Sequence, residues 1–450
     1  MRYFSARHNN GRNLRPPDLY EYFVDNFWFE TVDLDNQTIN APLRGRHKAD
    51  VVIIGGGYTG LSSAYHLKRQ FPEKHIVILE GACCGYGASG RNGGFCVTDI
   101  FLDQSRISEQ DIPDAVEVSF YGLNQIKRLI AEHNIECDFR ENGMLEVALN
   151  DQHIQSLAEQ ADRLRYFGLD VTLMDGDQLK GEIKSPIFKA GLKMPHGATL
   201  NPAKLAREMK RVVEALGVEV RERSVVTRVS PGKLNLVDTE LGEIEALILV
   251  IALNAYAHKL GFFRDHVFPV VVHQIATAPL TTAQWAAIGW QNRKGLSDHR
   301  PLYSYSIPTV DGRIVLGGVD FTYYDYDGLG SGNDKVVTRL IEEDLFTYFP
   351  QLEGLKIEHT WSGTTAYSLS RIPSVGVTGE HQNVYFGVGF SNGVPSAQTA
   401  GRIIADLMAG KSNKFTNHYI VNHKIPYAGP TATRGFFGKL YKWRTKTFGW

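Results

Sequence analysis

The chain has 450 residues, of which 43% are hydrophobic and 22% charged, and its formal net charge is −1. This size and composition are typical of a globular protein of two or three domains and argue against nucleic acid as a partner. The longest apolar stretch, ALILVIAL at 246–253, is too short to span a bilayer, and the first residues lack the apolar core of a signal peptide, which favours a cytoplasmic protein.

Near the N-terminus, YEYFVDNFWFE at 20–30 predicts a helix packed on the outside of the body. The four cysteines further along, Cys83, Cys84, Cys96 and Cys137, do not have the spacing of a metal site. We therefore expect no metal, and we interpret the cysteines as small buried side chains in a reduced compartment.

A glycine-rich turn follows the first predicted strand, VVII at 51–54. Gly55, Gly57 and Gly60 fit the pattern G-x-G-x-x-G, and residues 61–69 predict the helix after it. The first glycine permits a tight turn, the second lets a pyrophosphate approach the backbone, and the third lets the helix lie close to the sheet. Amides at the helix N-terminus would bind the anion.

A second predicted strand, IVIL at 76–79, ends at Glu80. A carboxylate at this position can accept hydrogen bonds from both hydroxyls of an adenosine ribose, and it would repel a 2′-phosphate. Strand, glycines, helix, strand and acid follow the order and spacing of a dinucleotide-binding unit. The spacing alone does not distinguish FAD from NAD, and an unrelated glycine-rich turn is the alternative.

Residues 85–94, GYGASGRNGG, form a glycine-rich loop that contains Ser89, Arg91 and Asn92. The small side chains and exposed amides of this loop suit a long cofactor that extends past the first strand–helix–strand unit, which favours FAD. A flexible surface loop is the alternative interpretation.

The middle of the chain predicts further elements of both kinds. Residues 113–165 are predicted to be rich in helix, and buried parallel strands are predicted at 246–252 and 384–388. The segments between residues 217 and 253 alternate and turn like a small antiparallel layer.

A helix is predicted after the last strand, and its N-terminus is reached through residues 389–394. The amides and the positive dipole end of this helix would stabilise the negative charge of a reduced flavin. An ordinary packed helix is the alternative.

Taken together, these motifs resemble the D-amino-acid-oxidase-like superfamily of FAD-dependent oxidoreductases, and within it the branch that includes gamma-glutamylputrescine oxidases. The resemblance runs over nearly the whole chain. The ASGRNGG loop and the segment GFSNGVPSAQTAG are its most specific parts, since many flavoproteins share the glycine fingerprint. Other matching segments are DFRENGMLEVA, HGATLNPAKLAREM, DGRIVLGG and WSGTTAYSLSRIPSVG.

The resemblance implies an α/β fold, in which a Rossmann-like FAD-binding domain is interleaved with an α+β substrate domain that carries a large mixed sheet. We expect an N-terminal extension at 1–48 and a basic aromatic C-terminal tail at 411–450. The FAD-binding domain would take residues 49–112, 196–262 and 357–410, and the substrate domain residues 113–195 and 263–356.

The resemblance also implies FAD that is bound without a covalent link. Some relatives attach flavin through a cysteine in the later half of the chain, but here Cys137 is the last one. Others use a histidine near the ASG loop, where this chain has Arg91 and Asn92. Val226 falls where the backbone of the family meets adenine. The expected cofactor-binding residues are Gly55, Gly57, Tyr58, Thr59, Gly60, Glu80, Ser89, Arg91, Asn92, Gly93, Gly94, Val226, Gly389, Ser391, Asn392, Gly393 and Val394.

The implied chemistry is hydride transfer from a C–H next to nitrogen to flavin N5, which leaves an imine that water hydrolyses. Such a reaction needs an oriented substrate and a dry pocket more than acid–base groups. Tyr303 and Tyr305 share a strand face, where they would orient an amine or simply pack in the core. His273 is a candidate basic group near the flavin, or else a buried structural histidine. Trp361 is expected to cover flavin or substrate, and Arg371 to face the cofactor or brace its loop.

One departure from the branch bears on the substrate. The branch usually has a Tyr-Arg pair ahead of the DGR turn, whereas YSYSIPTVDGR contains tyrosine without arginine. Relatives that bind amino acids often hold the carboxylate with a buried arginine. The expected substrate is thus a small-molecule amine or amino acid, with polyamine-like and secondary amines favoured.

The segment from Leu407 to Trp450 has no acidic residue and ends in TRGFFGKLYKWRTKTFGW. It would form a helix docked on the body or contact an anionic membrane surface. The favoured function is an amine or amino-acid oxidase that uses oxygen as the acceptor. A dehydrogenase that passes electrons to a membrane quinone or carrier, and a flavin-binding protein without amine chemistry, are the alternatives.

Overall fold

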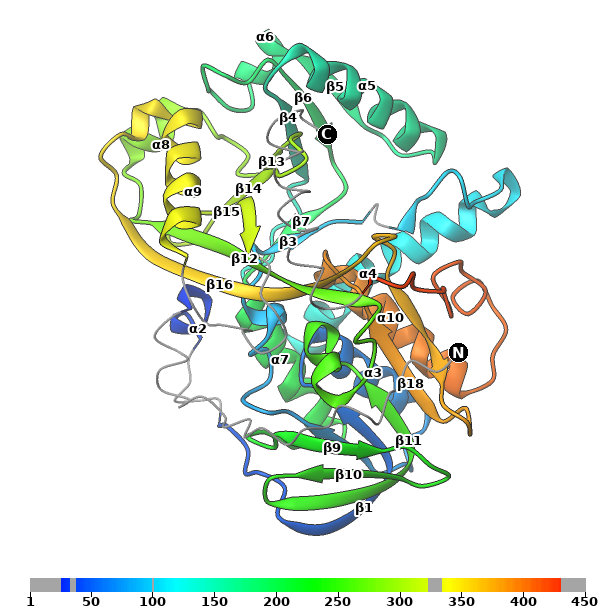
Figure 1. The fold of residues 1–450 in the computed structure, drawn as a ribbon. Helices are drawn as coiled ribbons and strands as arrows, with labels where there is room; N and C mark the ends of the chain where they lie inside the picture. The colour runs from blue at the N-terminus through cyan, green and yellow to red at the C-terminus, as the bar shows by residue number, and fades with distance from the viewer. Residues whose placement is uncertain (1–25, 33–37, 99–100, 323–333, 430–450) are drawn as a thin grey trace.

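The computed structural model describes residues 26–32, 38–98, 101–322 and 334–429, which form two modules, each built on an eight-stranded sheet (Figure 1). The lower module in Figure 1 contains the glycine-rich turn, and chain segments alternate between the two modules. The predicted α/β class with large mixed sheets is confirmed. Among the described residues, no helix is both long and apolar enough to cross a membrane.

The first sheet surrounds the glycine-rich turn. Its strands are β1 (Gly45–Ile54), β2 (Ile76–Leu79), β8 (Glu219–Arg221), β9 (Val226–Ser230), β10 (Asn235–Thr239), β11 (Gly242–Ile251), β17 (Ser374–Thr378) and β18 (Val384–Val388). Their main order is β17-β18-β11-β1-β2-β8, and β1 pairs in parallel with both β11 and β2. The four predicted parallel strands are therefore confirmed. β9 and β10 add an antiparallel extension beside β11, whereas β8 pairs in parallel with β2 and does not join the predicted antiparallel layer.

Both faces of this sheet are buried, as its unbroken apolar strands require. Val51 and Ile53 pack against the helices on one face, and Val52 and Ile54 pack into the core on the other. The helices of the first face are α3 (Tyr58–Gln70), α4 (Ile112–His133), α7 (Pro202–Ala215) and α10 (Gly393–Met408).

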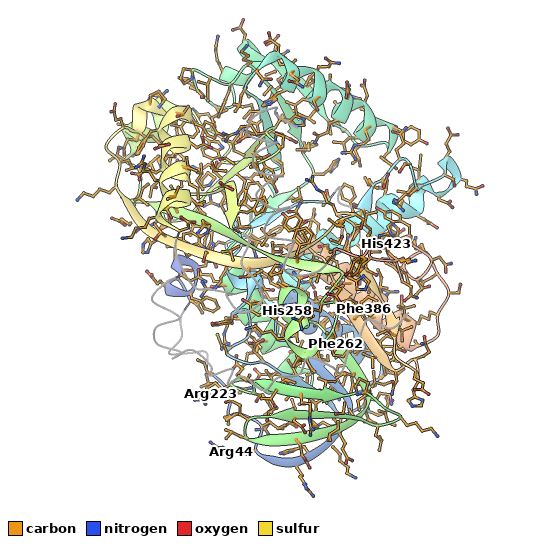
Figure 2. The ribbon with its side chains drawn as sticks, viewed as in Figure 1. Arg44, Arg223, His258, Phe262, Phe386 and His423 are labelled. Atoms are coloured by element: carbon orange, nitrogen blue, oxygen red, sulfur yellow. The ribbon has the colours of Figure 1, made fainter. Side chains whose placement is uncertain are left out.

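The second face carries η5 (Asn254–Leu260) and the chain that follows it. Phe262 and Phe386, both labelled in Figure 2, are buried together there, and the Phe262 N–H donates to the carbonyl oxygen of Ala257 of η5 at 3.1 Å. His258 Nδ1 lies 2.6 Å from the carbonyl oxygen of Ala255. Ala255, Ala257 and Leu260 of η5 belong to the core cluster on this face of the sheet, directly after the carboxyl end of β11.

The second sheet has the order β16-β12-β15-β14-β13-β4-β6-β5. Its strands are β4 (Met144–Ala148), β5 (Thr172–Asp175), β6 (Ala190–Met194), β12 (Val267–Thr277), β13 (Gly295–Asp298), β14 (Ser304–Pro308), β15 (Ile314–Thr322) and β16 (Ile357–Ser368). The helices of this module are α5 (Asp151–Tyr166), α6 (Gly176–Lys180), α8 (Thr282–Ile288) and α9 (Lys335–Tyr348). α9 packs Ile341 and Leu345 against Ile275 and Leu316 of the sheet.

Two segments differ from the expected domain boundaries. α4 packs with α3 and α10 of the first module, although residues 113–195 were expected in the substrate domain. β16 pairs with β12 in the second sheet, although residues 357–410 were expected in the FAD-binding domain. The remaining boundaries stay predictions.

The N-terminal prediction is wrong for the part that the structure describes. α2 (Phe27–Glu30) is a single turn, and Phe27, Trp28 and Phe29 are 1–4% exposed in a core cluster between the modules, not on the outside. The rest of the predicted helix, and the basic sequence from residue 430 onward, lie outside the described residues. The remaining short elements are β3 (Phe95–Cys96), β7 (Ala198–Thr199), η2 (Ala88–Gly90), η4 (Glu109–Asp111) and η7 (Pro350–Leu352).

Candidate functional site

A cavity of about 2550 Å³ lies between the two modules. The first module contributes the carboxyl ends of β1 and β2, the loop around η2, η5 and the start of α10. The second module contributes residues of β4, β12, β14 and β16. Ligands of open parallel sheets bind outside the carboxyl ends of the strands, and this volume exceeds that of a pocket for one small molecule.

The three fingerprint glycines have geometric reasons for lacking a side chain. Gly55 has φ of +109°, and a Cβ there would lie 2.6 Å from the carbonyl oxygen of Ala252. A Cβ at Gly60 would lie 1.9 Å from the carbonyl oxygen of Gly55, so α3 could not approach β1. A Cβ at Gly57 would lie 2.9 Å from Ser89 Oγ, inside the cavity wall. The cradle that a pyrophosphate needs is therefore present.

Tyr58, Thr59 and Ser89 line the cavity at the N-terminus of α3. Ser89 Oγ accepts a hydrogen bond from the Tyr58 backbone N–H at 2.9 Å, which ties the glycine-rich loop to the helix end. The Tyr58 hydroxyl points away and donates to the carbonyl oxygen of Pro202 at 2.8 Å. The serine hydroxyl is thus fixed beside the helix amides that would meet an anion.

Glu80 lines the cavity at the end of β2. Its Oε2 accepts from the Gly56 N–H at 2.7 Å and its Oε1 from the Ala82 N–H at 2.9 Å. Burial raises the pKa of Glu80 to about 7, against the opposing effect of these two hydrogen bonds. Val226 lines the same end of the cavity together with Val225. An acid with spare lone pairs next to an apolar wall fits a ribose and an adenine ring.

The glycine-rich loop at 85–94 is ordered by its own side chains. Asn92 Nδ2 donates to the carbonyl oxygens of Ala88 and Ser89 at 3.1 and 2.9 Å. Asn92 Oδ1 accepts from the Gly94 N–H at 2.9 Å. Asn92 and Gly93 line the cavity, whereas Gly94 is not among the described residues that do, so its predicted contact lacks support. Gly94 instead packs against Leu200, whose carbonyl oxygen would lie 2.4 Å from a Cβ.

The second module also holds this loop. The carbonyl oxygen of Arg91 accepts from Gln274 Nε2 at 2.7 Å and from Trp361 Nε1 at 3.0 Å. The Arg91 guanidinium donates through Nη1 to the carbonyl oxygen of Ser362 at 3.0 Å and through Nε to that of Tyr86 at 3.1 Å. Arg91 lines the cavity while its charge is directed at backbone carbonyls.

The described part of the N-terminal extension forms the third support. Asn26 Nδ2 donates to the carbonyl oxygen of Gly90 at 3.1 Å. Trp28 Nε1 donates to that of Asn92 at 2.9 Å. Because the loop is held from three directions, it matches a preformed binding surface and not the flexible loop that the sequence left open as an alternative.

The start of α10 forms another wall of the cavity through residues 390–394, which include Ser391, Asn392, Gly393 and Val394. Gly389, with φ of +83°, precedes this stretch and is not among its described lining residues. Asn254 braces the turn, since its Oδ1 accepts from the Gly389 N–H at 3.0 Å and its Nδ2 donates to the Phe390 carbonyl at 3.2 Å. The N-cap side chain makes no capping bond and the first turn contains no acid, which suits an anionic ligand group.

Tyr303 and Tyr305 both line the cavity, with ring centroids 5.9 Å apart. Tyr303 is 39% exposed because it faces this space. The Tyr305 ring fits against Gly93, where a Cβ would lie 2.4 Å from a ring carbon. Burial raises the pKa of both phenols above the ordinary value, so both hydroxyls are neutral donors at neutral pH.

His273 is not where the sequence prediction requires it. Residues 268, 270, 272 and 274 of β12 line the cavity, and alternate residues of a strand point to opposite faces. His273 is therefore turned away, fully buried and paired across the sheet with Ser362 of β16. The interpretation as a buried structural histidine fits, and the role beside the flavin does not.

Trp361 does not cover the cavity either. It is 1% exposed, its indole N–H donates to the Arg91 carbonyl, and its ring packs against Phe27 and Trp28. It supports the loop from behind. Arg371, on the turn after β16, does line the cavity.

Gln274, Asn254 and Trp28, among other residues of the site, were missed by the sequence analysis. Gln274 is next to the candidate His273 and faces the cavity, so a strict period of two along β12 could have identified it. Asn254 follows a predicted buried strand, a position where polar residues often meet ligands. Trp28 gave no signal, because its contact with Asn92 depends on how the extension folds back.

Comparison with known proteins agrees with this geometry. A family profile described as FAD dependent oxidoreductase matches residues 50–407. The gamma-glutamylputrescine oxidoreductase of Escherichia coli (strain K12) is 31% identical over 398 residues, which cover 86% of this chain and 89% of that protein.

Solved structures share the fold. Glycine oxidase from Geobacillus kaustophilus superposes with a TM-score of 0.72 at 19% identity, covering 84% of this chain and 100% of that one. L-proline dehydrogenase from P. horikoshii superposes with a TM-score of 0.70 at 20% identity, covering 82% and 95%. The cavity, the glycine cradle and the matched profile together show that the chain belongs to the family of FAD-dependent oxidoreductases.

Proposed function

We propose that the protein oxidises a C–N bond of an amine or amino acid, leaving an imine that water hydrolyses. The observation that carries this proposal is the continuity of one cavity from the glycine cradle to Tyr303 and Tyr305. The name of the Escherichia coli relative, a gamma-glutamylputrescine oxidoreductase, supports an amine as the substrate. When bound, FAD would supply a hydride acceptor at N5.

The residues that we propose hold FAD without a covalent link come from four places along the chain. The pyrophosphate would lie beside Gly57 and Ser89, and the adenosine beside Glu80 and Val226. The flavin would lie between the loop at 91–93 and the start of α10, where amides can stabilise charge on its pyrimidine side. All these residues line the cavity.

The chain itself would orient the amine and exclude water. Tyr303 and Tyr305 offer neutral hydroxyls for hydrogen bonding and aromatic faces that attract a cation. The wall beside the loop also carries Gln274, whose Oε1 is buried and has no hydrogen-bond partner within the described residues. An acceptor in this state suits an N–H group of the bound substrate or cofactor.

Oxygen is the electron acceptor that we propose, in an enzyme of the cytoplasm. Transfer to a membrane quinone or carrier is the alternative, and it rests on the basic aromatic tail at 411–450, of which residues 430–450 lie outside the described residues. Flavin binding without amine chemistry would be a third outcome.

Anaerobic absorbance of the purified holoprotein tests the proposal. Putrescine, gamma-glutamylputrescine, sarcosine, glycine and several D- and L-amino acids are added one at a time, and air is admitted afterwards. We expect one amine to bleach the flavin and air to restore it with formation of hydrogen peroxide. Slow recovery in air would favour the dehydrogenase, and a flavin that no amine bleaches would contradict the proposed reaction.

A further inference from the structure

The cavity has a polar end beyond the tyrosines, formed by β4, β13 and α5, which we call the distal end. Glu146 of β4 is at its centre: its Oε1 lies 2.6 Å from His299 Nδ1, and its Oε2 accepts from Gln160 Nε2 at 2.9 Å. His299 Nε2 in turn lies 2.7 Å from Ser156 Oγ. The residues of the distal end, all on the cavity wall, are Glu146, Ser156, Gln160, Asp298 and His299.

The distal end carries an excess of negative charge. In the part of the chain that the structure describes, Arg300 is a cation of this region, and two carboxylates share its guanidinium: Asp298 Oδ2 lies at 2.8 Å, and Asp344 is in contact. Glu146 adds a third carboxylate, so these four groups have a formal charge of −2 when the imidazoles are neutral.

The distal end is separated from the loop at 91–93 by the tyrosines. Gly93 touches the Tyr305 ring, and the Tyr303 ring follows at 5.9 Å. Burial raises the pKa of the Tyr303 phenol, and the charges of Tyr367 and Glu146 add to this effect. A ligand that reaches from the loop to Glu146 must therefore be elongated and pass along aromatic faces, which favour a cation or a methylene chain.

The carboxylate of Glu146 has lone pairs left after its two hydrogen bonds, since an ionised carboxyl group accepts about four. We propose that the distal end binds a second positive charge of an elongated amine substrate, and that Glu146 contacts it. The inference rests on the proposed function and names its substrate class, an amine with an ammonium group at the end that does not react. Arg371, which lines the cavity as Arg91 and Arg300 do, makes a carboxylate at that end the rival interpretation.

Calorimetric titration of the anaerobic holoprotein, with its flavin chemically reduced beforehand so that no amine can be oxidised, tests this inference without relying on turnover. The probes are α,ω-diamines, 1-aminoalkanes and ω-amino acids over a matched series of chain lengths. At the best length, we expect the diamine to bind about tenfold more tightly than the aminoalkane, as for a hydrogen bond to a charged group, and the ω-amino acid to bind most weakly. Equal affinities, or a preference for the ω-amino acid, would overturn the proposal.

Variants connect the preference to the residue. Glu146→Gln keeps the size and should bring diamine and aminoalkane affinities to within about threefold. Glu159→Gln is the matched control. Glu159 is exposed on α5 outside the cavity, so this substitution removes the same charge away from the distal end. Ser156→Lys, which places an ammonium group at the distal end, should abolish diamine binding even if the Glu146 variant fails to fold.

The outcomes also separate this inference from the proposed function. A diamine preference that disappears in Glu146→Gln, with no bleaching by any amine, would keep the distal end and contradict the reaction. Bleaching by amines without a diamine preference, or with a preference that survives Glu146→Gln, would support the proposed reaction and contradict the role of the distal end.

Discussion

Glu222 gives the sharpest test of how the FAD-binding module is held together. This side chain is fully buried just after β8, and its Oε1 lies 2.6 Å from Arg207 Nη1 and accepts from the Cys84 N–H at 2.7 Å. Its Oε2 accepts from the Asn40 N–H at 2.7 Å and lies 3.7 Å from Lys210 Nζ. One carboxylate thus joins α7, the turn after Glu80 and the N-terminal segment.

The substitution Glu222→Gln keeps the shape and removes the negative charge. Arg207, whose side chain is 1% exposed, would keep its buried positive charge and lose the carboxylate of Glu222 as a partner. Breaking a buried ion pair in this way costs about 3–5 kcal/mol. The glutamine oxygen can still accept one backbone hydrogen bond, so we expect a loss near the lower bound, about 3 kcal/mol.

Thermal unfolding of the FAD-saturated protein, followed by circular dichroism at a fixed scan rate, measures the effect. At about 2–4 °C per kcal/mol for a cooperative unit of about 200 residues, the expected fall in Tm is about 6–12 °C. Glu219→Gln is the control, because Glu219 pairs with His75 and Arg221 at the surface, where an ion pair is worth about 0–1 kcal/mol. Equal shifts for the two variants would refute the reasoning.

Three further predictions concern the cofactor site. Trp28→Phe removes the hydrogen bond to the Asn92 carbonyl and leaves a buried acceptor unsatisfied. We expect the Kd for FAD to rise about tenfold in fluorescence titrations of the FAD-free protein. An unchanged Kd would contradict the role of Trp28 in supporting the loop. Burial raises the pKa of Glu80 to about 7, and ribose hydroxyls donate stronger hydrogen bonds to its charged form, so FAD should bind more tightly as pH rises through 7. That pH dependence of FAD affinity should vanish in Glu80→Gln. If the affinity of the variant changed with pH as in the wild type, another group would be responsible. Gly93→Ala would place a methyl group 2.4 Å from the Tyr305 ring, so we expect an altered flavin spectrum and a large loss of turnover, and a wild-type spectrum would contradict the predicted contact.

Much of the first module could be predicted because its signals are local. The apolar runs around Val51 and Ile78 are continuous since both faces of the sheet are covered, and the glycines between strand and helix meet steric limits that any such turn imposes. The acid at the end of β2 follows from the same unit. These features need no knowledge of the rest of the chain.

The second module was harder to predict because its site depends on contacts between distant segments. His273 and Gln274 are neighbours in sequence, and only the pairing of β12 decides which one faces the cavity. Trp361 has the expected residue type, but its indole N–H donates to the Arg91 carbonyl, so it supports the loop at 85–94 and does not face the cavity. Trp28 donates a hydrogen bond to Asn92, which is 64 residues away in the sequence, and no local sequence pattern predicts this contact.

The central claim is that an amine gives up hydrogen from the carbon next to its nitrogen. The most direct measurement is anaerobic stopped-flow bleaching of the holoprotein with the best amine of the panel, comparing the ordinary amine with one deuterated at that carbon. The account predicts that the deuterated amine bleaches the flavin several times more slowly, with one carbonyl product formed for each flavin reduced. Equal rates in a step shown to be chemistry, or bleaching without that product, would contradict it.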